Sequence, residues 1–256
     1  MEYVVPRLSD GLGNRLFQYA VALGLAQKWG RKIAFSRSFI VSTNHGDLED
    51  FIKLFPHVPI IDGPENPKIL MQASEDLFKY VEFKNAPLEN VVLIDYRQNP
   101  QYFIGVDLKP AWPPAEGNAA WMIHFRRGDY DKLSHYSVDL TRYYRRCILA
   151  VPEGSTLRIF SDEPSKCNDM LDSILDGRQL NISWCTETID YKAMYEMSLC
   201  TGGAITANST FSWWGAYFAR GRAGSKFQAF YPSCWGAGLP DPAGIVPTWG
   251  EIVDIK

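Results

Sequence analysis

Two adjacent arginines carry the clearest chemistry in this sequence. Arg126 and Arg127 follow an apolar segment that predicts a strand, and Gly128 and Asp129 come directly after them. Guanidinium groups are permanently charged, forked donors, a geometry that suits a diphosphate. A solvated basic turn paired with Asp129 is the alternative. The carboxyl end of a strand is where α/β sheets bind ligands, and this position favours the binding role.

A glycine-rich segment, Gly11 to Arg15, lies between a predicted strand and a predicted helix. Glycine lets the backbone approach an anion at a helix N-terminus, where unpaired N–H groups favour negative charge. A ligand-free turn is the alternative. The pattern does not match a dinucleotide fingerprint, because Leu16 stands where the third glycine belongs and the next strand ends in Ser36 rather than an acidic residue.

A third segment, Asn208 to Trp214, places small polar residues where a strand meets a helix. Its hydroxyl groups could cap the helix or bind a phosphate oxygen. For Trp213 and Trp214 we expect core packing rather than sugar stacking. Asp162, which closes another strand, could accept a hydrogen bond from a base or ribose, or cap the next helix.

Metal and hydrolase chemistry have little support in the residue pattern. Asp129 and Asp131 form an Asp-x-Asp pair, but two hard oxygen ligands are too few to specify a metal. The chain has no Gly-x-Ser-x-Gly, His-Glu-x-x-His or P-loop motif and no clustered His/Cys set.

The elements that must position these segments form two α/β halves. The first is predicted from strands at 3–8, 32–36 and 91–95, a helix at 14–29, and short helices and loops over 43–67. The second alternates five strands (119–125, 156–161, 181–185, 204–207, 226–231) with four helices (139–150, 166–175, 190–199, 210–219). This alternation predicts a parallel, doubly wound sheet. A Pro-rich stretch over 109–118 marks the boundary between domains 1–112 and 113–256.

Composition sets the remaining limits. The 256 residues are 46% hydrophobic, which excludes intrinsic disorder as the main state. With 26 basic and 29 acidic residues and no basic block, the chain is not a dedicated nucleic-acid binder. No signal peptide or transmembrane segment is visible, and five widely spaced cysteines are typical of reduced thiols. We expect a cytoplasmic protein, with peripheral membrane association left open and the oligomeric state not indicated.

Four motifs, in order and over most of the chain, resemble the α-1,2-fucosyltransferases of glycosyltransferase family 11. They are the segments Gly11 to Ala20, His124 to Tyr130, Phe160 to Pro164 and Asn208 to Trp214. The resemblance implies a GT-B-like fold with two Rossmann-like domains facing a cleft, the first on the acceptor side and the second binding the nucleotide sugar. It implies inverting, metal-independent transfer of L-fucose from GDP-fucose to a glycan hydroxyl, O-2 of a galactose, without a cofactor.

The resemblance also implies roles for single residues. Arg126 corresponds to the arginine that neutralises the β-phosphate as GDP leaves, with Arg127 holding the site beside it. The other donor-binding positions are Gly13 and Asn14 in the loop that meets the donor, His124 and Asp162 for guanine, and Ser209, Thr210 and Phe211 for the diphosphate. The acceptor hydroxyl must lose a proton, and Asp129 is the nearest candidate base in sequence, with a structural carboxylate orienting Arg127 as the alternative.

One segment departs from the family pattern. Asp95-Tyr96-Arg97-Gln98 stands where members carry Gly-Tyr-aromatic-Gln. The change falls on the acceptor side, so the acceptor-binding residues stay unassigned. Two other functions remain open: the same scaffold with another nucleotide-sugar donor, and a non-catalytic glycan-binding derivative.

Overall fold

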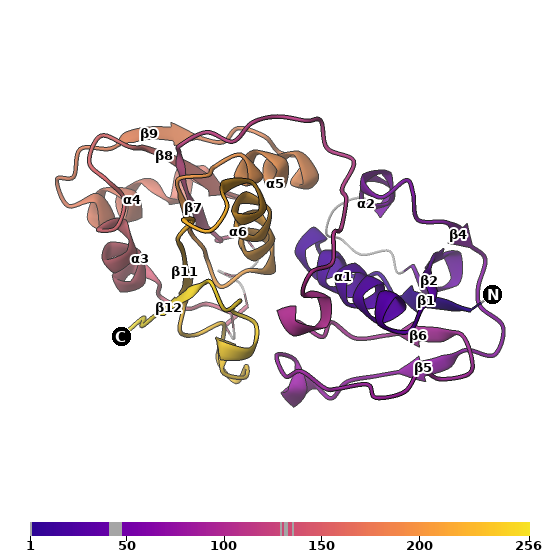
Figure 1. Cartoon of the computed structure of the whole chain (residues 1–256). Coiled ribbons are helices and arrows are strands. Elements are labelled where there is room, and N and C mark those ends of the chain that lie inside the picture. Colours follow the sequence, from indigo (N-terminus) through magenta and orange to yellow (C-terminus); the bar gives the residue numbers. More distant parts are fainter. Residues whose placement is uncertain (1, 41–47, 129, 131–132, 135) are drawn as a thin grey trace. The chain divides into compact units, whose positions relative to one another are not determined.

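The computed structural model describes residues 2–40, 48–128, 130, 133–134 and 136–256. It divides into two compact units, Met1–Pro113 and Pro114–Lys256 (Figure 1). Each unit is built around its own parallel β-sheet.

The first unit holds a four-stranded sheet in the order β2-β1-β6-β5. The strands are β1 (Tyr3–Pro6), β2 (Lys32–Ile33), β5 (Lys68–Leu70) and β6 (Val91–Leu93), and every neighbouring pair is parallel. Val4 and Val5 in the central strand are fully buried. Proline cannot donate a ladder hydrogen bond, and Pro6 fits here because it is the last residue of β1, beyond the positions paired with β2.

Helices and aromatic rings cover this sheet. Helix α1 (Leu12–Lys28) begins two residues before the predicted start and buries most of its length. The predicted strand over 32–36 is split: β2 stays in the main sheet, whereas β3 (Phe35–Ser36) pairs with β4 (Ile60–Ile61) in a separate sheet. Tyr19 of α1 packs against Phe35 and against Phe51 and Phe55 around α2 (Leu48–Leu54). Short 3₁₀ turns complete the unit: η1 (Arg37–Phe39), η2 (Ser74–Asp76) and η3 (Pro100–Phe103).

The second unit holds a six-stranded parallel sheet in the order β12-β11-β10-β7-β8-β9. Its strands are β7 (Trp121–Phe125), β8 (Thr156–Ser161), β9 (Asn181–Trp184), β10 (Gly203–Ile205), β11 (Ala229–Pro232) and β12 (Glu251–Val253). The chain runs outward from β7 to β9, returns to β10 beside β7, and then runs outward on the other side. This is the doubly wound topology predicted from the sequence, with β12 as an edge strand that the prediction missed.

Helices α3 (Thr141–Ile148) and α4 (Asn168–Leu175) pack together, as do α5 (Asp190–Ser198) and α6 (Thr210–Ala223) (Figure 1). The turn η4 (Pro164–Lys166) lies between β8 and α4, and η5 (Pro242–Gly244) lies between β11 and β12. All four predicted helices are present, with ends shifted by up to four residues. Trp121, Ile123 and Phe125 of β7 join the core cluster that contains the buried residues of α3 and α4.

The packing of α1 against η3 gives a first prediction. A Cβ at Gly24 would lie 2.1 Å from the Tyr102 carbonyl oxygen, so Gly24→Ala must push backbone apart and should lower the free energy of unfolding by about 1–3 kcal/mol. Gly221 in α6 is the matched control because its Cβ would meet nothing within 4 Å. Gly221→Ala should raise stability by about 0.5–1 kcal/mol. Chemical denaturation measures both, and equal effects would contradict the packing argument.

Candidate active site

The second sheet has a topological switch point between β7 and β10. The chain leaves β7 toward β8 on one side and continues from β10 toward β11 on the other, so the loops after these two strands diverge and leave a crevice. Arg126 and Arg127 follow β7, and the segment from Asn208 into α6 follows β10. The fold therefore brings two of the sequence motifs to the place where open α/β sheets bind ligands.

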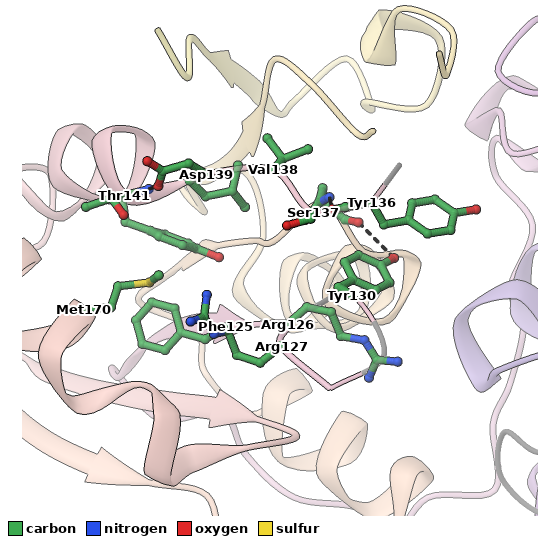
Figure 2. Close-up of a pocket in the computed structure, with 13 residues that line it drawn as sticks. Phe125, Arg126, Arg127, Tyr130, Tyr136, Ser137, Val138, Asp139, Thr141 and Met170 are labelled. Atoms are coloured by element: carbon green, nitrogen blue, oxygen red, sulfur yellow. Dashed lines mark hydrogen bonds between the residues drawn. The ribbon is translucent and has the colours of Figure 1, made fainter. Parts of the chain in front are cut away.

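The two arginines point to different sides. Side chains alternate along a strand, so Arg126 continues the face of His124, whereas Arg127 continues the face of Phe125. In Figure 2 the Arg126 guanidinium extends beside Tyr130, and its carbon lies 5.3 Å from the centre of that ring. Arg127 acts electrostatically on Asp139, whose pKa is lowered mainly by hydrogen bonds from Thr141 and in smaller part by this arginine. The two guanidinium groups therefore do not form a single fork.

Asp162 holds the arginine segment from the end of β8. One carboxylate oxygen forms a 2.9 Å ion pair with Nη1 of Arg126, and the other accepts from the backbone N–H of Arg127 at 2.9 Å. Gly128 permits this approach because a Cβ there would stand 2.4 Å from the Asp162 carboxylate. Asp162 thus fixes the position of Arg126, and its predicted contact with guanine stays a prediction.

His124 is a buried, neutral imidazole. Its side chain lies 5.8 Å from the Phe211 ring, centre to centre, and Nδ1 has no hydrogen-bond partner among the described residues. Burial, assisted by the positive charge of Arg126, lowers the His124 pKa to about 3. A neutral imidazole offers one N–H donor and one acceptor nitrogen. His124 can therefore read a polar edge by hydrogen bonding but cannot supply charge near neutral pH.

The start of α6 combines capping with anchoring. The Ser209 hydroxyl accepts from the Phe211 N–H at 3.3 Å, so the capping alternative is realised for this residue. The Asn208 amide donates to the carbonyls of Tyr136 and Trp235, both at 3.1 Å. These bonds tie the loop after β7 and the segment after β11 to the strand–helix junction, which also carries Thr210 at the first position of the helix.

Trp213 and Trp214 lie in the core, as predicted. Both side chains are fully buried, and their rings meet edge to face with centres 4.8 Å apart. The Trp213 indole N–H donates to the Ile245 carbonyl at 2.8 Å. These contacts confirm core packing for the tryptophan pair.

A pocket of about 350 Å³ lies beside the arginines (Figure 2). Its lining includes Arg126, Arg127, Tyr130, Asn208 and the segment from Tyr136 to Thr141. The sequence did not indicate this last wall, because Asp139 and Thr141 have the pattern of an ordinary helix cap. The Asp139 carboxylate does accept from the Thr141 N–H at 2.9 Å. Asp129 and Asp131 lie outside the described residues.

Gly13 and Asn14 belong to the first unit. Both lie in the first turn of α1, which begins at Leu12, so they are helical rather than part of a loop. The Asn14 side-chain oxygen accepts from Nε2 of Gln98 at 3.0 Å. Their predicted contact with the donor stays a prediction.

The segment that departs from the family pattern contains a buried ion pair. Arg97 Nη2 lies 2.8 Å from Asp95 Oδ2, with 3% and 10% of the two side chains exposed. The Arg97 guanidinium also lies over the Phe83 ring at 4.9 Å. Burial raises the pKa of Asp95 to about 6, and the opposing effect of Arg97 is smaller. The two residues that differ from the family pattern, Asp95 and Arg97, thus form an ion pair with one another.

No group of three or more His, Cys, Asp or Glu side chains is placed to hold a metal ion in the part of the chain that the structure describes. Within the same residues, no helix has the length and apolar character needed to cross a membrane.

The state of His124 predicts a pH dependence of stability. The folded pKa of His124 is about 3, below the ordinary value of 6.5. Below pH 6.5 the unfolded chain therefore binds a proton at this residue, whereas the folded chain leaves the imidazole neutral. The free energy of unfolding should therefore fall on acidification, by about 1.4 kcal/mol per pH unit from this residue. His124→Gln removes that contribution between pH 4 and pH 6. Denaturation curves at pH 4, 5 and 6 measure the slope, and identical slopes in both proteins would contradict the burial effect.

Comparisons with known proteins agree with this architecture. No protein-family model matches the chain. Two curated proteins of Escherichia coli are similar to it: an "Alpha-1,2-colitosyltransferase", 26% identical over 258 residues (85% of this chain, 88% of that protein), and the "O-antigen biosynthesis glycosyltransferase WbnK", 24% identical over 271 residues (82% and 88%).

Solved structures support the fold. A crystal structure of the NodZ α-1,6-fucosyltransferase soaked with GDP-fucose and one of the fucosyltransferase NodZ from Bradyrhizobium each match with a TM-score of 0.50 and 14% identity. Each match covers 84% of this chain and 91% of the other. At this identity the likeness concerns the fold alone. Taken with the two curated relatives, it identifies the chain as a glycosyltransferase with a GT-B-like fold.

Proposed function

We propose that this enzyme belongs to glycosyltransferase family 11 and transfers L-fucose from GDP-fucose to a glycan hydroxyl, O-2 of a galactose, with inversion and without a metal. The observation that carries the proposal is Arg126, fixed by Asp162 at the switch point of the second sheet. The neighbour soaked with GDP-fucose and the relative named for an α-1,2 transfer support the donor class and the linkage.

Arg126 acts on the leaving group. As the acceptor oxygen bonds to C1 of fucose, the bond from C1 to the diphosphate oxygen breaks and its electron pair leaves with GDP. A guanidinium already held in place by Asp162 stabilises the charge that develops on the β-phosphate, without reorganising during the reaction.

The remaining motif residues bind the donor. The neutral imidazole of His124 suits a guanine edge, and Asp162 is assigned to the same base only by the family resemblance. Ser209, Thr210 and Phe211 present the backbone of the α6 N-terminus to the diphosphate, with Arg127 on the pocket side. Gly13 and Asn14, in the first unit, are proposed to contact the donor. The same unit is proposed to bind the acceptor. Asp129, weighed as a base from the sequence, keeps that role only as a prediction.

A second candidate is transfer of another sugar from its nucleotide on the same scaffold. The colitosyltransferase relative favours colitose, a sugar related to fucose. The contacts proposed above address the nucleotide and the diphosphate, so they do not separate the two sugars.

Calorimetric titration of the purified chain with GDP and GDP-fucose, beside UDP, other GDP-sugars and the colitose donor, tests the donor. We expect binding that is selective for guanine nucleotides and unchanged by a chelator. A preference for UDP, or binding that requires a metal, would overturn the proposal. Guanine-selective binding with turnover of the colitose donor alone would establish the second candidate.

Removal of the Arg126 side chain should abolish most of the catalysis. Arg126→Ala loses the charge that meets the leaving diphosphate, and kcat should fall on the order of a hundredfold or more. Arg142→Ala is the matched control, because Arg142 is an exposed arginine of α3 and its loss should leave kcat unchanged. A folded Arg126→Ala protein with full transfer activity would contradict the role.

A further inference from the structure

The pocket beside Arg126 has a wall that the fold holds in place (Figure 2). The Tyr130 ring stacks on the Tyr136 ring with centres 5.0 Å apart, and the Tyr130 hydroxyl donates to the Asn208 carbonyl at 3.2 Å. The Asn208 amide in turn donates to the Tyr136 carbonyl at 3.1 Å. All lining residues belong to the second unit, so the pocket is complete within that unit.

The lining of this pocket combines three kinds of surface. Arg126 and Arg127 make one part cationic. Phe125 and Met170 make another part apolar: Phe125 belongs to the core cluster, and Met170 packs against that cluster while partly exposed. Asp139 is the single carboxylate among the described residues that line the pocket. A diphosphate uses the cationic part alone, so the other two surfaces call for a second chemical group.

The Asp139 carboxylate indicates what that group carries. Hydrogen bonds from Thr141 lower the pKa of Asp139, so its side chain is anionic at neutral pH. A carboxylate repels a phosphate but accepts strongly from a hydroxyl. The region around Asp139 therefore suits a neutral group with hydroxyls. A nucleotide sugar has two such groups, the ribose and the transferred sugar.

The apolar surface favours the transferred sugar over the ribose. Fucose and colitose both carry a methyl group at C6, which gains from contact with Phe125 and Met170, whereas ribose has no methyl group. The side chains of His124 and Phe125 point to opposite faces of β7, because they are neighbours in a strand. With guanine proposed at His124 and the diphosphate at Arg126, the sugar falls on the Phe125 side.

We propose that this pocket binds the transferred sugar and selects 6-deoxy sugars, with the sugar methyl group against Phe125 and Met170 and a ring hydroxyl donating to Asp139. The proposal rests on the proposed function, which gives the diphosphate to Arg126. It holds for fucose and for colitose, because both sugars have the methyl group.

GDP-L-galactose tests the apolar part, because it differs from GDP-fucose by one hydroxyl on C6. We expect the native protein to bind GDP-fucose more tightly by about 10²-fold, measured as a ratio of Kd values by calorimetry. Met170→Gln supplies a hydrogen-bonding group of similar length and should reduce this preference to about tenfold. Met71→Gln is the control, because Met71 is a 71% exposed methionine of the first unit.

Asp139→Asn tests the hydroxyl contact. Asparagine can still accept from the Thr141 N–H, so the start of α3 is kept while the charge is lost. The Kd for GDP-fucose should rise by about tenfold, and the Kd for GDP, which lacks the sugar, should stay unchanged. Asp241→Asn is the matched control: Asp241 is exposed, accepts from the Ala243 N–H at the same 2.9 Å, and does not line the pocket.

Three results would overturn the sugar pocket. An equal rise of both Kd values in Asp139→Asn would give the pocket to the guanosine, and no change in either would remove the contact. Equal binding of GDP-fucose and GDP-L-galactose by the native protein, or a preference that Met170→Gln leaves intact, would remove the selection of 6-deoxy sugars. Failure of the native protein to bind GDP would instead overturn the proposed function, so the two failures are distinguishable.

Discussion

The ion pair between Arg126 and Asp162 organises the second unit's site. It follows from strand register: β7 and β8 pair in parallel with His124 opposite Phe160 and Phe125 opposite Ser161, so the residues that leave the two strands meet at the same level. Gly128 then lets the Asp162 carboxylate approach where a Cβ would clash. With both oxygens of Asp162 engaged, the arginine is positioned before any anion arrives, and such preorganisation makes a charged donor effective in catalysis.

Both units have polar or ionisable side chains with low solvent exposure at the carboxyl edges of their sheets, where burial lowers the stability of the fold. His124 is buried as a neutral ring, and the Asp95 side chain is 10% exposed, a partial burial that raises its pKa although Arg97 is its ion-pair partner. Buried polar and charged groups lower stability unless they are paired. Asp10 and Arg97 at the edge of the first sheet also have a positive φ, a backbone conformation that is strained for residues other than glycine. In both respects the carboxyl edges differ from the apolar interior. The core itself follows ordinary packing, as the buried tryptophan pair shows.

Polar side chains gather at the carboxyl edges of both sheets. The second sheet reverses its winding direction between β7 and β10, whereas in the first sheet the carboxyl ends of β1 and β6 lie side by side without such a reversal. In the second sheet these are cationic and amide groups suited to a nucleotide diphosphate, and in the first a carboxylate, a tyrosine and two amides suited to a hydroxyl-rich acceptor. The proposed function assigns the donor to the edge in the second unit and the acceptor to the edge in the first.

The sequence by itself determined the α/β class, the helices and most strands of the second unit, the core position of Trp213 and Trp214, and the segments that reach the sheet edges, because periodicity and turn residues are local signals. Only the tertiary structure decided that Arg126 and Arg127 diverge, that Asp162 clamps Arg126, and that residues 136–141 wall the pocket. It also added the edge strand β12 and divided 32–36 between two sheets. These features depend on partners distant in the chain, such as Asp162 for Arg126 and Tyr96 for Asp10, and no local pattern encodes such pairings.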